Sequence, residues 1–338
     1  MPKKLFSIFK YLVFLGLGIF LTWWQLGKMD AEQQLQFKES LLHANYIVIL
    51  PVVIMSLLSH LSRAIRWRLL IEPMGYRPGI ANAFFALMTG YFANTFIPRA
   101  GEVLRCTLLS KHERIPFSKL IGTILLERVF DLFCYVIVIF ITILIQIATV
   151  SDFVKKTFAG IFEVGNSSER ITKILIIVFI LAGGVLYIRW LFKRYADHRH
   201  IIKIRSASKG LKEGFSTILH LRKRRLFLLH TLFIWSMYLM QIYIGFQSLD
   251  QTSSLTLNAA FSILSLATLA MIISPGGIGA FPVAVQQVLL IYDVDNISFG
   301  WLMWGTTTAI VIVAGVLSFI LLTFINNKRN ESSPEHPA

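Results

Sequence analysis

Long apolar runs constrain the fold of this chain more than any other feature of its sequence. The chain is 55% hydrophobic and only 15% charged, whereas soluble domains carry roughly 25% charged residues. This composition excludes a soluble enzyme, a coiled coil and a disordered chain. It predicts an all-α polytopic membrane protein, with a single transmembrane domain over 1–325 and a short polar cytoplasmic tail over 326–338. About 20 apolar residues cross a bilayer as a helix, and six stretches are predicted to do so: 6–27, 45–62, 118–148, 172–190, 226–248 and 299–325.

The net charge of +15 is concentrated between the apolar runs. Segment 189–225 holds twelve basic residues against Asp197 and Glu213, a bias that marks cytoplasmic loops. We therefore expect both termini in the cytoplasm, in a bacterial inner membrane. Basic loops attract anionic lipid headgroups, so the expected partners are anionic membrane lipids and not nucleic acid. The basic loop over 193–225 is also a candidate contact for a protein partner.

Two further apolar segments do not fit the alternation of sides that the crossings require. Segment 80–98 lies between two basic stretches and is too short to cross twice, so we expect it to dip in from the cytoplasm and return. Segment 257–292 is broken by Pro and Gly at 274–279 and is expected to enter and return from outside, or to form two short crossing helices. With three crossings in each half, 1–150 and 172–325 joined by an outside loop, the halves are predicted to be inverted repeats, a frequent transporter design.

The first candidate site follows the segment that dips into the membrane. Asn94 precedes a break at Pro98 and Gly101, and Arg99 and Arg105 flank that break. Arginine binds phosphate oxygens in a bidentate manner, and Glu102 could orient one of the two arginines by pairing. The alternative is that these arginines mark a cytoplasmic turn and bind no ligand.

The second candidate site lies inside the predicted third crossing. Glu127 and Asp131 are four residues apart and share a helix face, while Arg128 can pair with Asp131. Ionisable groups at this depth usually face protein or a water-filled cavity. The acids could receive Arg99 or Arg105, or could carry protons. The alternative is a locally neutralised patch that only holds helices together.

Two weaker candidates remain. The glycines of the break at 274–279 could expose backbone amides to an anion, or could serve as a hinge or a close packing point; they are Gly276, Gly277 and Gly279. Arg63 and Arg66 share a face near the end of the second crossing, beside Trp67, and are interpreted mainly as interfacial anchors, with lipid headgroup binding as the alternative. We find no zinc-protease, serine-hydrolase or P-loop motif, and therefore predict no catalytic residue, metal or cofactor.

Four short motifs follow one another over nearly the whole chain: Arg63-x-x-Arg66-Trp67-Arg68-x-Leu70, Asn94-x-x-x-Pro98-x-x-Gly101-Glu102-x-x-Arg105, Glu127-Arg128-x-x-Asp131 and Pro275-Gly276-Gly277-Ile278-Gly279. Together, and in this order, they resemble the flippase-like integral membrane family related to the transmembrane region of lysylphosphatidylglycerol synthase. That resemblance implies translocation of lipids or lipid-linked headgroups between leaflets. Pro282 stands where many relatives carry a glutamate, so no role of that acid carries over.

The leading hypothesis is a carrier or scramblase for an anionic phospholipid or lipid-linked headgroup. Its polar path would be lined by the residues of the first two candidate sites, with the glycine break opposite. One rival is a non-transporting membrane partner subunit of an envelope-lipid or cell-surface biosynthesis enzyme, bound through the basic loop. The other is a membrane-embedded enzyme acting on a lipid, which would need a nucleophile or metal site that the sequence does not offer.

Overall fold

A computed structural model describes residue 16 and residues 18–97, 99–146 and 221–331, and all regular structure among them is helical. The predicted fourth crossing at 172–190, the outside loop and most of the basic loop lie outside the described residues. The predicted first crossing is described only in part, as helix over 18–27. The chain divides into two compact units, Met1–Asp131 with Leu221–Ala338, and Leu132–His220. Every side-chain contact used below lies in the first unit.

Four described helices are long and apolar enough to cross a membrane. Over the described residues their positions coincide with the predicted crossings at 45–62, 118–148, 226–248 and 299–325. Large apolar side chains are exposed along them, as lipid-facing helices require; examples are Ile47, Leu50, Ile54, Leu229, Leu232, Leu317 and Phe324. These helices are α3 (Tyr46–Ile71), α6 (Phe117–Ile145), α10 (Arg224–Gly245) and α13 (Ser298–Glu331).

Helix α3 continues well beyond the predicted end of the second crossing at residue 62. Asn45 caps its start by accepting a hydrogen bond from the amide of Ile47, and the helix tolerates Pro51 in its second turn. It ends at Ile71, where a short 3-10 turn, η1 (Glu72–Met74), is followed by Gly75 with φ of 88°. Arg63 and Arg66 therefore lie inside the helix, beyond the predicted end of the crossing. The predicted end followed the fall in hydropathy at these arginines. Arginine has a high helix propensity, so the helix continues through them.

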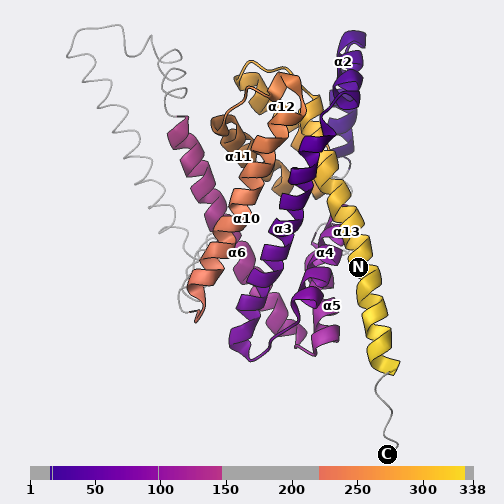
Figure 1. Ribbon diagram of the computed structural model, residues 1–338, viewed down its shortest axis with the longest axis vertical. Helices are drawn as coiled ribbons and strands as arrows, with labels where there is room; N and C mark the ends of the chain where they lie inside the picture. Colours follow the sequence, from indigo (N-terminus) through magenta and orange to yellow (C-terminus); the bar gives the residue numbers. More distant parts are fainter. Residues whose placement is uncertain (1–15, 17, 98, 147–220, 332–338) are drawn as a thin grey trace, which may run out of the picture. The chain divides into compact units, whose positions relative to one another are not determined.

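The segment at 80–98 and the residues after it form a helical hairpin (Figure 1). Helix α4 (Ile80–Phe96) is continuous, and the chain turns back as α5 (Ala100–Glu113). Between them Ile97 is extended and Arg99 is left-handed, with φ of 67°. A side chain on Gly101 would overlap the carbonyl oxygen of Gly90, so glycine permits the close approach of the two helices. The expected return within 80–98 is thus wrong in detail, because α5 returns and 99–119 is mostly helix.

The predicted break in segment 257–292 is confirmed. Helix α11 (Leu257–Ile273) and helix α12 (Ala280–Ile291) pack against each other and are separated by the 3-10 turn η4 (Pro275–Gly277). Gly276, Gly277 and Gly279 all have positive φ, which side chains on L-residues disfavour. The indole of Trp304 on α13 donates a hydrogen bond to Gly276 O at 2.8 Å. The break is therefore a built turn held by a neighbouring helix.

The remaining described elements lie in the connections. Helix α2 (Ala31–Leu42) begins at Asp30, whose carboxylate accepts from the amide of Gln33 in a capping box. Two short 3-10 turns follow α10: η2 (Phe246–Ser248) and η3 (Asp250–Thr252). Whether the two halves of the chain are inverted repeats stays a prediction, as does the side of the membrane on which each helix ends.

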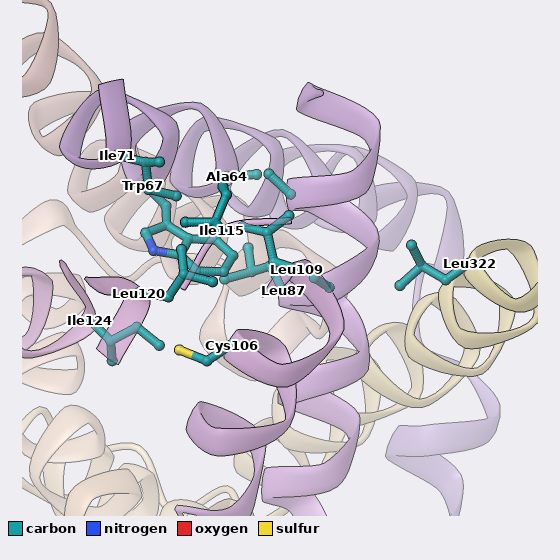
Figure 2. Close-up of a cluster of buried hydrophobic side chains, with 12 residues drawn as sticks. Ala64, Trp67, Ile71, Leu87, Cys106, Leu109, Ile115, Leu120, Ile124 and Leu322 are labelled. Carbon is teal, nitrogen blue, oxygen red and sulfur yellow. The ribbon is translucent and has the colours of Figure 1, made fainter. Parts of the chain in front are cut away.

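A buried apolar core fixes α3, α4, α5, α6 and α13 against one another (Figure 2). Trp67 is its largest member and is fully buried. It packs with Leu87 from α4, Leu109 from α5 and Leu120 from α6, and burial of such side chains is worth roughly 1.5–3 kcal/mol each. Trp67 follows Arg66 in the chain, so this core determines where the neighbouring polar residue lies.

Candidate functional site

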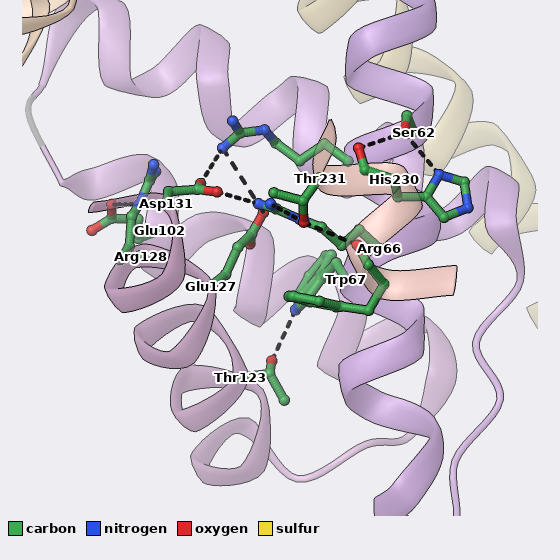
Figure 3. A network of polar contacts seen from close by, with 12 residues as sticks. Ser62, Arg66, Trp67, Glu102, Thr123, Glu127, Arg128, Asp131, His230 and Thr231 are labelled. Atoms are coloured by element: carbon green, nitrogen blue, oxygen red, sulfur yellow. Dashed lines mark hydrogen bonds and ion pairs between the residues drawn. The ribbon is translucent and has the colours of Figure 1, made fainter. Parts of the chain in front are cut away.

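Five charged side chains from three helices meet inside the first unit. Figure 3 labels Arg66, Glu127 and Asp131 among them. Arg63 and Arg66 share one face of α3 three residues apart, and Glu127 and Asp131 share one face of α6 four residues apart. Arg105 reaches them from α5. Arg66 is 0% exposed, and Arg105 and Glu127 are each 1% exposed. We call these five residues the buried charge cluster.

Within the cluster each carboxylate is shared between arginines. The Arg66 Nη2 donates to Glu127 Oε1 at 3.1 Å and to Asp131 Oδ1 at 2.7 Å. The Arg63 Nη1 donates to Asp131 Oδ2 at 3.0 Å, and the Arg105 Nη2 donates to Glu127 Oε2 at 2.9 Å. Removing one partner of a buried pair of this kind typically costs about 3–5 kcal/mol.

Helix α10 supplies neutral acceptors to the same arginines. The Arg66 Nη1 donates to Thr231 Oγ1 at 3.2 Å, and the Arg63 Nη2 donates to Tyr238 Oη at 3.0 Å. Sequence reasoning missed both residues, because single hydroxyls are common in membrane helices. Their spacing of seven residues, two helical turns on one face, was the signal available.

Trp67 orients the third arginine. The guanidinium carbon of Arg105 lies 4.9 Å from the centre of the indole ring, and Trp67 Nε1 donates to Thr123 Oγ1 at 2.9 Å. The interpretation of Arg63, Arg66 and Trp67 as interfacial anchors is therefore wrong. An anchor must reach the headgroup region, whereas these side chains are enclosed by neighbouring helices.

The buried charge cluster carries more positive than negative charge. Three guanidinium groups contact two carboxylates, and among the described residues these arginines form ion pairs only with Glu127 and Asp131. Several buried donors also lack a hydrogen-bond partner in the described part of the chain: the Nε of Arg63, Arg66 and Arg105, and the Nη1 of Arg105. An unpaired buried donor costs about 1–3 kcal/mol, and more when it is charged.

A second, more exposed ion pair lies beside the cluster. The Arg128 Nε donates to Glu102 Oε1 at 3.0 Å, with side chains 40% and 28% exposed. Arg99 is exposed at the start of α5 and forms no ion pair with the described acids. Of the two arginines predicted as alternatives to enter the network, Arg105 is the one that does. Arg99, Glu102 and Arg105 are three residues apart and grade from exposed to buried along α5; we call them the α5 stripe.

The other candidate residues have structural contacts. Asn94 Oδ1 accepts from the amide of Gly101 at 2.8 Å and so ties the end of α4 to α5. A side chain on Gly276 would lie 3.5 Å from the carbonyl oxygen of Thr95, which brings the glycine break next to the turn of the first hairpin. The break therefore contacts the end of α4, four residues before Arg99 in the chain. The amide of Gly277 donates within the turn, to Ser274 O at 3.3 Å.

The described residues form helices, four of which are long and apolar enough to span a membrane, and they hold a buried guanidinium–carboxylate cluster. These features define a polytopic integral membrane protein. It belongs to the family of the lysylphosphatidylglycerol synthase TM region, whose model matches residues 7–303. This confirms the family that the four motifs indicated.

Similar proteins are archaeal members described only as UPF0104 membrane proteins. That of Methanocaldococcus jannaschii is 23% identical over 295 residues, covering 82% of each chain. That of Methanothermobacter thermautotrophicus is 21% identical and covers 85% of this chain and 86% of its own. The Pyrococcus horikoshii protein is 22% identical and covers 85% of this chain and 88% of its own. No solved structure matches the chain significantly.

Proposed function

We propose that this protein translocates an anionic phospholipid, or an anionic lipid-linked headgroup, between the two leaflets of its membrane. The observation that carries the proposal is the buried charge cluster, four of whose five residues lie on helices long and apolar enough to cross a membrane. Charged groups at this depth are costly and usually mark the path of a substrate or ion. In this proposal the lipid headgroup passes the cluster while its acyl chains stay in the bilayer.

The arrangement of arginines fits that task. A phosphate entering hydrocarbon loses its hydration, and the loss is offset when guanidinium groups replace water as hydrogen-bond donors. The α5 stripe leads from exposed Arg99 to buried Arg105. Between them lies half-exposed Glu102, which is paired with Arg128. A headgroup moving along α5 would therefore meet polar side chains at each turn of the helix.

The family description supports a phospholipid substrate, because it names one, lysylphosphatidylglycerol; it does not support the anionic charge, because the lysyl group of that lipid is cationic. We propose a carrier and not an enzyme, and we propose downhill transport, because no P-loop motif is present in the sequence to couple nucleotide hydrolysis. Glu127 and Asp131 would act as partners that hold Arg63 and Arg66 in position.

Purified protein reconstituted into vesicles tests the proposal. Vesicles carry a fluorescent phosphatidylglycerol or a fluorescent phosphatidylcholine, and dithionite bleaches only label in the outer leaflet. We expect the wild-type protein to make inner-leaflet phosphatidylglycerol accessible faster than phosphatidylcholine. Vesicles with protein that bleach no faster than empty vesicles would contradict the proposal and favour a non-transporting partner subunit.

A matched pair of variants on α3 ties any transport to the cluster. Arg66→Gln removes a guanidinium with three acceptors in the cluster and α10. Arg68→Gln removes a guanidinium two residues away that, in the described part of the chain, pairs only with half-buried Glu72, at 3.5 Å. Loss of a charged hydrogen bond at a buried site predicts a transport rate lower by about tenfold or more in Arg66→Gln. Arg68→Gln should transport at the wild-type rate.

A further inference from the structure

The three arginines of the buried charge cluster differ in how many of their N–H groups have a hydrogen-bond acceptor. Arg66 donates to Thr231 and both carboxylates, and Arg63 donates to Asp131 and Tyr238. Among the described residues Arg105 has one hydrogen-bond acceptor, Glu127, although a guanidinium has five N–H donors. Its Nε and Nη1 are both buried without a partner among the described residues.

We propose that Arg105 binds one phosphodiester monoanion, with the rest of the cluster acting as its electrostatic support. This inference rests on the proposed function only for the source of that group, a lipid headgroup. A single negative charge would balance three guanidiniums against two carboxylates. A phosphodiester carries that one charge on two non-bridging oxygens, which match the fork of N–H groups on arginine.

The surroundings of Arg105 fit this role. The indole of Trp67 lies against its guanidinium, 4.9 Å from the ring centre, and Trp67 is itself fixed by Thr123. Glu127 accepts a hydrogen bond only from Nη2 of Arg105, which orients the guanidinium. The Nε and Nη1 of Arg105 are left to donate to a ligand. Arg105 is also the buried end of the α5 stripe, which begins at exposed Arg99.

The charge balance also predicts which lipids are discriminated against. Phosphatidylcholine has the same phosphodiester, but its cationic headgroup would need a carboxylate partner. Both carboxylates of the cluster, Glu127 and Asp131, are already shared between arginines. An anionic headgroup such as that of phosphatidylglycerol meets no such conflict, because it adds no positive charge to a site that has an excess.

Binding is measured on the purified full chain in detergent, stripped of endogenous lipid. Thermal unfolding is followed with added phosphatidylglycerol, phosphatidylcholine or inorganic phosphate, and native mass spectrometry counts lipids retained per chain. We expect phosphatidylglycerol to raise the unfolding temperature of the wild-type protein more than phosphatidylcholine does, with one molecule retained. Arg105→Gln should weaken retention by about tenfold or more, Arg105→Lys should have an intermediate effect, and Arg68→Gln should retain lipid as the wild type does.

Each other outcome is decisive. Equal retention of phosphatidylglycerol by wild type and Arg105→Gln overturns the inference, as does equal stabilisation of the wild type by the two lipids. If Arg105→Gln does not fold, the lipid comparison on the wild type and the Arg105→Lys variant still decide. Stabilisation by inorganic phosphate but by neither lipid would support a phosphate site at Arg105 and contradict lipid translocation. Transport that is unchanged in Arg105→Gln would leave the proposed function standing and remove Arg105 as its headgroup ligand.

Discussion

Replacing Glu127 by glutamine is the sharpest perturbation of the buried charge cluster. Glu127 accepts from Arg66 at 3.1 Å and from Arg105 at 2.9 Å, and lies 3.8 Å from Arg63. Glu127→Gln leaves three buried guanidiniums with one carboxylate, so the surplus positive charge doubles. Breaking a buried pair from one side costs about 3–5 kcal/mol, and we expect a loss of this size in the free energy of unfolding.

Glu102→Gln is the matched control. It makes the same chemical change in the ion pair with Arg128, whose side chains are 28% and 40% exposed. Exposed pairs contribute about 0–1 kcal/mol, so this variant should unfold close to the wild type. Arg105→Gln should also cost less than Glu127→Gln, because it neutralises the cluster and leaves Glu127 paired with Arg66.

Unfolding in mixed detergent micelles with increasing dodecyl sulfate, followed by tryptophan fluorescence, gives the three free energies. The chain contains seven tryptophans, among them fully buried Trp67. Glu127→Gln within about 1 kcal/mol of the wild type would refute the reasoning, since that is the range of an exposed pair. So would an equal loss in Glu102→Gln, or an Arg105→Gln variant less stable than Glu127→Gln.

Two further substitutions test the hairpins that carry the site. Gly101→Ala should abolish most folded protein on size-exclusion chromatography, because its new Cβ would overlap Gly90 O; Gly122→Ala, with nothing within 4 Å, should elute as the wild type does. Trp304→Phe removes the hydrogen bond to Gly276 O, and should lower the free energy of unfolding by about 0.5–1.5 kcal/mol in the same micelle assay. A normal yield of Gly101→Ala, or an unchanged Trp304→Phe, would contradict the described contacts.

The coarse fold could be predicted from the sequence because its determinants are local. Apolar runs define the four described spans. Proline and glycine at 274–279 mark the turn between α11 and α12. The turn at Arg99 was also marked by Pro98 and Gly101. The helix that follows that turn, α5, is not predicted by the sequence, because it is too polar to resemble a membrane helix.

The cluster was only half predictable, because its charges are neutralised by residues far away in the chain. Glu127, Asp131 and Arg105 stood out as ionisable groups near or inside apolar segments. Arg63 and Arg66 were assigned to the interface, since hydropathy cannot distinguish an arginine exposed to headgroups from one paired with an acid more than 60 residues later. That distinction needs the three-dimensional contact between α3 and α6.

The most direct test of the central claim is a cryo-electron-microscopy structure in nanodiscs of phosphatidylglycerol. The claim is that an anionic headgroup enters the buried charge cluster. We predict phosphate density at Arg105, with oxygens at about 2.7–2.9 Å from its guanidinium nitrogens, and Glu127 still on Nη2. Lipid density confined to the outer surfaces of the helices, with Arg105 and its neighbours arranged as in the lipid-free protein, would contradict the account.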